Sequence, residues 1–174
     1  HTFDKSLDFK PKNYEKKVRI KKSYVSINNY DSLTSMLSVL NKKKIVSIDL
    51  ETTDLDPNRA KIVGISISYK EHSGFYIPFI SSDKMSDSFN SDEILSIIKP
   101  FLENPSIKYI GQNIKYDMLV LKRNNIEINC IYFDTMIAES LISPEKNSYK
   151  LDILAKDYLN YSMIPIEDLI GPKS

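Results

Sequence analysis

Asp49 and Glu51 stand two positions apart at the end of the apolar run at positions 45–48. Side chains at i and i+2 of a β-strand point to the same face, so the two carboxylates are expected to lie side by side. Two like charges held together are unfavourable unless a cation neutralises them. Mg²⁺ and Mn²⁺ prefer oxygen ligands. The pair therefore indicates a divalent-cation site; the alternative is a strand that simply ends in an acidic loop.

A third carboxylate, Asp117, lies in the helix that follows a later apolar run. Asn113 is a candidate cap for this helix, whose inward face is predicted to carry Ile114, Met118 and Leu121 at i, i+4 and i+7. Asp117 falls at i+3, on the same face. A carboxylate on a core-facing stripe needs a cation or several hydrogen-bond donors. The alternative is that it only supports the helix N-terminus through charge–dipole attraction.

The two acidic segments would meet if their strands are parallel neighbours. In an open sheet, reactive groups collect at the carboxyl ends of the strands. Asp49, Glu51 and Asp117 would then form an oxygen-rich site. Two-metal phosphoryl-transfer chemistry uses such a site, where one ion activates water and the other stabilises the leaving oxygen.

The remaining periodicities predict an α/β fold around a mixed five-stranded sheet flanked by helices. Short turns joining the first three strands imply an antiparallel meander, and alternating strands and helices afterwards imply parallel pairing. Residues 24–27 also alternate and are a further candidate strand. The expected strands are 45–48, 62–67, 75–77, 107–110 and 131–133, and the expected helices are 32–40, 91–102, 114–121, 135–142 and 151–159.

The length of 174 residues fits one domain with an appendage. Residues 1–22 carry eight lysines and arginines against three acidic residues, and we expect a basic tether there, with nucleic-acid contact as the alternative. Residues 23–174 form the predicted domain. A single cysteine, Cys130, excludes an intrachain disulfide. No apolar run is long enough to span a membrane and no signal peptide is evident, so we expect a cytoplasmic protein.

The segments DLETTDLD (Asp49–Asp56) and GQNIKYD (Gly111–Asp117) resemble the first two motifs of a known family. This family comprises the 3′–5′ proofreading exonuclease domains of bacterial-type DNA polymerase I, which are DEDD nucleases with a ribonuclease-H-like fold. The similarity extends from about residue 24 to the end of the chain. It includes the segments Phe133–Met136 and Glu167–Gly171.

The resemblance implies two-metal hydrolysis of the 3′-terminal phosphodiester, with release of nucleoside monophosphates. It implies two Mg²⁺ (or Mn²⁺) ions in the complete domain, held by Asp49, Glu51 and Asp117. The implied partners are the 3′ end of single-stranded DNA and a polymerase domain of the same parent chain, associated with the bacterial nucleoid. Positions that match substrate contacts are Thr52, Leu55, Gln112, Asn113 and Tyr116.

The sequence departs from the family pattern in three respects: one motif is missing and two residues differ. None of the eleven tyrosines has an aspartate four residues later, so the third motif, Tyr-x-x-x-Asp, with its fourth carboxylate, is expected beyond Ser174. Ser148 replaces a substrate-contacting arginine, a charge that Lys146 or Lys150 could partly restore. Ile166 replaces a stacking phenylalanine, and losing one stacking partner weakens single-strand binding by about 1–3 kcal/mol. We therefore expect this chain to be weakly active or inactive.

Two other functions fit the same sequence. A ribonuclease-D-like exoribonuclease would use the same carboxylates on RNA. A non-catalytic domain would only support the polymerase, but retention of all three carboxylates argues against that reading.

Overall fold

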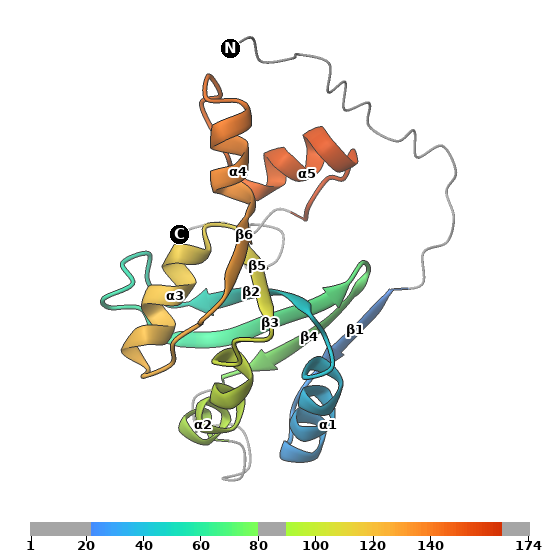
Figure 1. Cartoon of the computed structure of the whole chain (residues 1–174), viewed down its shortest axis with the longest axis vertical. Coiled ribbons are helices and arrows are strands. Elements are labelled where there is room, and N and C mark those ends of the chain that lie inside the picture. Colours follow the sequence, from blue (N-terminus) through green and yellow to red (C-terminus); the bar gives the residue numbers. More distant parts are fainter. Residues whose placement is uncertain (1–21, 80–89, 165–174) are drawn as a thin grey trace, which may run out of the picture.

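A six-stranded mixed sheet runs through the centre of the computed structural model, which describes residues 22–79 and 90–164 (Figure 1). The strand order is β1-β4-β3-β2-β5-β6. The strands are β1 (Ser23–Ser26), β2 (Ile45–Thr52), β3 (Ile62–Lys70), β4 (Ser73–Pro78), β5 (Lys108–Gly111) and β6 (Ile131–Asp134). The helices are α1 (Tyr30–Leu40), α2 (Ser91–Leu102), α3 (Ile114–Arg123), α4 (Thr135–Ile142) and α5 (Leu151–Leu159).

The pairing of the strands confirms both predicted halves of the sheet. β2, β3 and β4 form an antiparallel meander. β5 runs parallel to β2, and β6 runs parallel to β5. The helix that follows β5 is therefore delivered to the carboxyl end of β2, the edge on which the two acidic segments were expected to meet.

The predicted count of five strands was wrong, because β1 adds a sixth. β1 pairs in parallel with β4 at the edge of the sheet, and the backbone N–H of Ile27 continues the pairing by donating to the carbonyl of Tyr76 at 2.8 Å. All four residues of β1 are exposed. The alternation at residues 24–27 indicates this strand as a candidate, but the predicted sheet does not include it.

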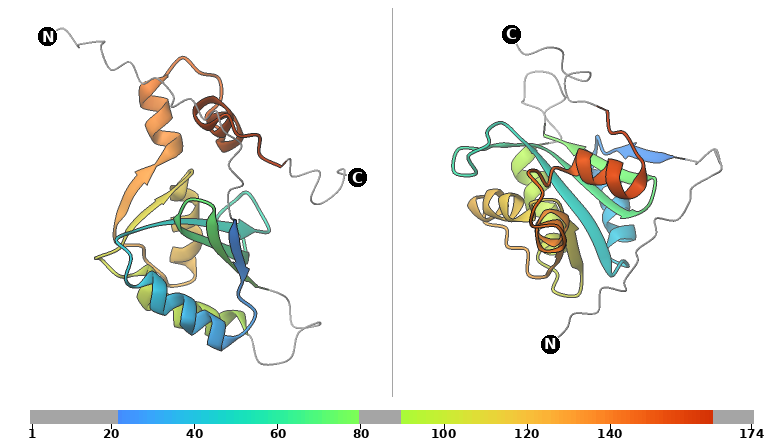
Figure 2. Two further views of the ribbon diagram at one scale, coloured as in Figure 1. Left: turned by 90° about the vertical axis from the view of Figure 1, so that its right-hand side faces the viewer. Right: turned by 90° about the horizontal axis from the view of Figure 1, so that it is seen from above.

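β2 separates a buried face from an open one. Val46, Ile48 and Leu50 are buried, whereas Asp49 and Glu51 alternate with them and are exposed. The helices α1 and α2 lie together on one side of the sheet (Figure 2). Their apolar residues join those of the strands in one core. Burial therefore fixes the register of β2, since a shift by one residue would turn both carboxylates into the core.

Asp134 at the end of β6 binds the first turns of two helices. It is 8% exposed, and its carboxylate accepts hydrogen bonds from the backbone N–H groups of Met136 and Ile137, which makes Asp134 the N-cap of α4. It also accepts from the N–H groups of Asn113 and Ile114, at 3.1 and 2.9 Å. A single carboxylate thus satisfies four donors that would otherwise lack partners.

The helices α4 and α5 lie at the opposite end of the molecule from α1 and α2 (Figures 1 and 2). The buried carboxylate of Glu139 joins them, because it pairs with Lys146 at 2.6 Å and accepts a hydrogen bond from the hydroxyl of Tyr158 at 2.6 Å. Lys146 also pairs with Asp157 at 3.0 Å. The ammonium of Lys146 is therefore engaged within this helix pair, which leaves the exposed Lys150 as the other candidate for the missing arginine charge.

Two predictions concern residues outside the ranges that the structure describes. The basic tether lies outside the described residues apart from Lys22, as does Ile166, and both interpretations stay predictions. Among the described helices, none has the length and apolar character needed to cross a membrane.

Replacing Asp134 with alanine is expected to destabilise the fold by about 2–4 kcal/mol, because four backbone donors lose their shared acceptor. Urea unfolding measured by circular dichroism tests this value. Asp31→Ala is the matched control: this exposed acid in the first turn of α1 should cost no more than about 0.5 kcal/mol. Equal stability of the two variants would contradict the role of Asp134.

Candidate active site

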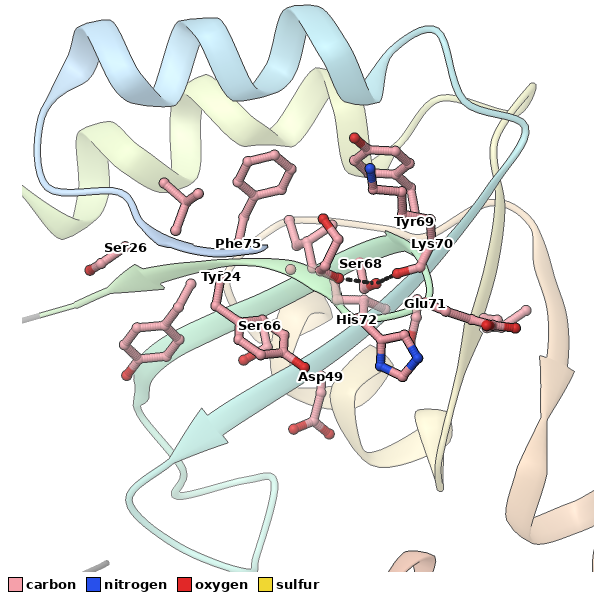
Figure 3. A pocket seen from close by; sticks show the side chains of 18 of the residues that line it. Tyr24, Ser26, Asp49, Ser66, Ser68, Tyr69, Lys70, Glu71, His72 and Phe75 are labelled. Atoms are coloured by element: carbon pink, nitrogen blue, oxygen red, sulfur yellow. Dashed lines mark hydrogen bonds between the residues drawn. The ribbon is translucent and has the colours of Figure 1, made fainter. Parts of the chain in front are cut away.

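Asp49 and Glu51 occupy the open face of the central strand. Asp49 lies opposite Ser66 of β3, and Glu51 lies opposite Gly64. Asp49 and Ser66 point to the side of the sheet away from α1 and α2 (Figure 3). Within the described residues, neither carboxylate accepts a hydrogen bond or pairs with a cation. The alternation in β2 thus confirms that both carboxylates share one face, and it leaves them uncompensated.

A hollow of about 1220 Å³ borders this open face and extends round to the other face of the sheet, where Tyr69 and Phe75 pack against the core. Its lining comes from β1 to β4, from the turn between β3 and β4 and from Ile110 of β5. It includes Asp49, Glu51, Tyr24, His72 and Tyr76. Tyr24, His72 and Asp49 are visible around it in Figure 3. The two carboxylates are therefore accessible from a space large enough for a small ligand.

Asp117 is buried beside the same strand. It is 3% exposed, and its Oδ1 atom accepts a hydrogen bond from the backbone N–H of Leu50 at 3.0 Å. Leu50 follows the point at which the β2–β5 pairing ends, at Ser47 and Ile110. The Asp117 carboxylate therefore provides the hydrogen-bond acceptor for Leu50 where β5 no longer pairs with β2.

The pKa values of the acids reflect their crowding and burial. Burial, followed by the charge of Asp49, raises the pKa of Asp117 from 3.8 to about 7, against the opposing effect of the Leu50 N–H. Although the Asp49 residue is exposed, desolvation by the protein atoms packed around its carboxylate, followed by the charge of Glu51, raises its pKa. The structure thus places Asp49 within electrostatic reach of both Glu51 and Asp117. The described residues nonetheless contain no group of three acidic, histidine or cysteine side chains close enough to hold a metal ion as it stands.

Asn113 is the residue before α3, as predicted, but its side chain makes no capping hydrogen bond. Its backbone is left-handed, with φ 54° and ψ 39°, a conformation that asparagine tolerates better than most residues. Asp134 takes over the capping of α3. The sequence does not indicate that Asp134 caps α3, because a contact across 20 residues leaves no local signal.

Thr52 and Tyr116 lie together beyond the carboxylates. Their hydroxyl groups are hydrogen-bonded to each other at 2.6 Å. The Tyr116 hydroxyl also donates to the carbonyl of Asp54. Two of the predicted substrate-contacting residues thus meet at the end of β2, where they fix the turn that follows.

Leu55 lies in that turn and is 95% exposed, which excludes ordinary packing as its role in the described structure. The turn itself is tightly bonded. Asp54 accepts a hydrogen bond from the backbone N–H of Asp56 at 2.9 Å, and Arg59 pairs with both acids at 3.3 and 3.4 Å. An apolar side chain is thus presented to solvent by an ordered loop.

Gln112 is engaged within the protein. Its Nε2 atom donates to the carbonyl of Tyr149 at 2.7 Å, and its Oε1 atom accepts from the hydroxyl of Thr135. The side chain therefore links the end of β5 to the start of α4 and to the segment before α5. Its predicted contact with substrate stays a prediction.

Parallel and antiparallel strands in this order, flanked by helices, define a ribonuclease-H-like fold. Residues 24–171 match the family described as 3′–5′ exonuclease. The chain belongs to this family, as the resemblance of its two acidic motifs predicted.

Relatives and solved structures agree with this assignment. The chain is 42% identical over 147 residues to DNA polymerase I of Borreliella burgdorferi, an alignment that covers 84% of this chain and 16% of the relative. The chain thus spans about one sixth of that protein. In fold it is similar to Escherichia coli RNase D (TM-score 0.62, 17% identity, covering 84% of this chain and 36% of that one). It is also similar to Brucella melitensis NrnC with bound Mg²⁺ (TM-score 0.56, 19% identity, covering 83% and 65%).

The raised pKa of Asp117 predicts that metal-free protein loses stability as the pH rises. Between about pH 4 and the folded pKa of about 7, the unfolded chain releases this proton while the folded protein retains it. Asp117→Asn keeps an acceptor for Leu50 without the charge. We expect the variant to exceed the wild type in unfolding free energy by about 1–3 kcal/mol at pH 7.5, and to differ much less at pH 4.5.

Urea unfolding in the presence of EDTA at both pH values measures this difference. Asp31→Asn, which removes an exposed acid from α1, should follow the wild type at both. An Asp117→Asn curve with the same pH dependence as the wild type would show that the carboxylate is not protonated in the folded state.

Proposed function

We propose that this domain is the proofreading 3′–5′ exonuclease of a DNA polymerase I, acting on the 3′ end of single-stranded DNA beside a polymerase domain of the same parent chain. The observation that carries the proposal is the uncompensated pair Asp49 and Glu51 on the central strand, with the buried Asp117 beside it. The similarity to DNA polymerase I of B. burgdorferi supports DNA as the substrate. The corresponding location is the cytoplasm, in contact with the chromosome.

The acidic residues fit a divalent cation by their chemistry. Asp49 and Glu51 offer adjacent carboxylate oxygens without a cationic partner among the described residues, and Asp117 lies in a buried position where its charge is unfavourable. These three residues would hold Mg²⁺ or Mn²⁺. The bound ions would supply an activated water and stabilise the leaving 3′ oxygen.

Other residues are placed to hold the terminal nucleotides. Leu55 presents an apolar side chain that can wedge against a base, a contact that is tolerant of sequence. Thr52 and Tyr116 place hydroxyl groups beside that turn. Asn113 lies at the start of α3, the helix that carries Tyr116. Gln112 would contact substrate only after exchanging at least one of its present hydrogen bonds.

We propose that the 174 residues alone hydrolyse DNA weakly or not at all. The sequence contains no Tyr-x-x-x-Asp. Asp49, Glu51 and Asp117 would supply three carboxylate ligands, whereas the two-ion chemistry of this family uses four. In addition, the described side chains do not yet form a closed metal-binding group. Three carboxylates would still give a measurable, weak affinity for one ion.

Mn²⁺ binding tests the site directly. Electron paramagnetic resonance titration of the wild type should show a bound ion, and Asp49→Ala should weaken binding by at least about tenfold because a ligand is lost. Asp31→Asn should bind like the wild type, since this acid lies on α1 away from the open face. Equal binding by wild type and Asp49→Ala would refute the site.

Cleavage of 3′-labelled oligonucleotides tests the activity and its substrate. With Mg²⁺ present, we expect the 174-residue chain to release nucleoside monophosphates far more slowly than a protein extended through the third motif, and the extended protein to prefer DNA over RNA. Matching rates for the two proteins would overturn the proposed weakness. A preference of the extended protein for RNA would favour the ribonuclease-D-like function. If the extended protein binds Mn²⁺ but cleaves neither substrate, the result would favour the alternative function of a non-catalytic domain.

A further inference from the structure

Tyr76 lies across a glycine on the open face of the sheet. Tyr76 of β4 pairs with Ser66 of β3, and Gly64 lies two residues along β3 on the same face. A Cβ atom at Gly64 would lie 2.6 Å from Cζ of Tyr76 and would also overlap its hydroxyl oxygen. The ring therefore crosses β3 at the one position where no side chain obstructs it.

The ring is directed toward the strand that carries the carboxylates. On the other side of Gly64 lies its partner in β2, Glu51. Tyr76 and Glu51 both line the hollow. In agreement with this placement, burial and then the charge of Glu51 raise the pKa of the Tyr76 hydroxyl. A long, exposed glutamate without a hydrogen-bond partner among the described residues thus has a hydroxyl group within electrostatic reach.

We propose that Tyr76 is a positioning residue of the nuclease site, whose hydroxyl orients the Glu51 carboxylate as a cation ligand. Carboxylates that bind metals are commonly held by a second group, and such groups tune affinity about 10–100-fold. Fixing the flexible glutamate side chain also reduces the entropy lost when it binds an ion. Gly64 has the permissive role, because only its missing side chain allows the ring to reach across β3. This inference rests on the proposed function.

Mn²⁺ titration of matched variants tests the role. Tyr76→Phe retains the ring over Gly64 and removes only the hydroxyl, so the fold is preserved. We expect it to weaken Mn²⁺ binding by about tenfold, at the lower end of such effects. Tyr24→Phe is the control, because Tyr24 lines the same hollow but pairs with Gly74 on the far edge of the sheet. Its affinity should equal that of the wild type.

Gly64→Ala provides an independent test of the geometry. The added methyl group meets the far end of the tyrosine side chain, which can move aside, so this variant displaces the hydroxyl without removing it. It should weaken Mn²⁺ binding as Tyr76→Phe does, and the double variant should be no weaker than either single one. Wild-type affinity in Tyr76→Phe, with Asp49→Ala defective, would overturn the role of Tyr76 and leave the proposed function intact.

A measurement made without metal tests whether the Tyr76 hydroxyl faces Glu51, independently of whether the proposed metal site binds an ion. In protein labelled with ¹³C at the tyrosine ζ carbon, Tyr76→Phe assigns the Tyr76 resonance. Glu51→Gln should move that resonance at neutral pH, whereas Asp31→Asn should leave it in place. If the wild type binds no Mn²⁺, the proposed metal site fails, and this shift still decides the inference: an unmoved resonance shows that the hydroxyl does not face Glu51.

Discussion

The hydrogen bond from the Leu50 backbone to the buried carboxylate of Asp117 joins α3 to the central strand, and the geometry of the site depends on it. β5 stops pairing with β2 before Leu50 and turns into α3. Asp117 then provides an acceptor for a backbone donor that would otherwise be buried without one, at a cost of about 1–3 kcal/mol. The third carboxylate is thus located by the same strand that carries Asp49 and Glu51.

This arrangement is electrostatically unfavourable in isolation, and other contacts must offset it. Burial and the neighbouring charge raise the pKa of Asp117, which means that its ionised form is destabilised where it lies. Asp134 anchors the start of α3 through two backbone N–H groups, and the apolar residues Val120 and Leu121 bury the rest of its inner face. The fold therefore holds an acid where its ionised form is unfavourable, as functional sites commonly do.

The sequence could predict features that depend on neighbouring residues. The alternation of β2 placed Asp49 and Glu51 on one face, and the strand–helix order implied the parallel pairing of β5. Contacts between distant segments left no such signal. The second role of Asp134, the bonds of Gln112 to a segment 37 residues away, and the passage of Tyr76 over Gly64 all depend on the register between strands and helices. The alternation at residues 24–27 indicated a candidate strand, but its pairing with β4, about 50 residues away, left no local signal.

Adjacent residues of α3 couple the acidic site to the loop that carries Leu55. Asp117 binds the backbone of β2 at Leu50, and Tyr116 binds the backbone beyond its end, at Asp54. The two contacts lie on either side of Glu51, so α3 fixes the strand and the following turn as one unit. Under the proposed function, the cation ligands and the apolar wedge are thereby held in a constant relation before substrate arrives. Less conformational entropy is then lost on binding, which is the advantage of a preorganised site.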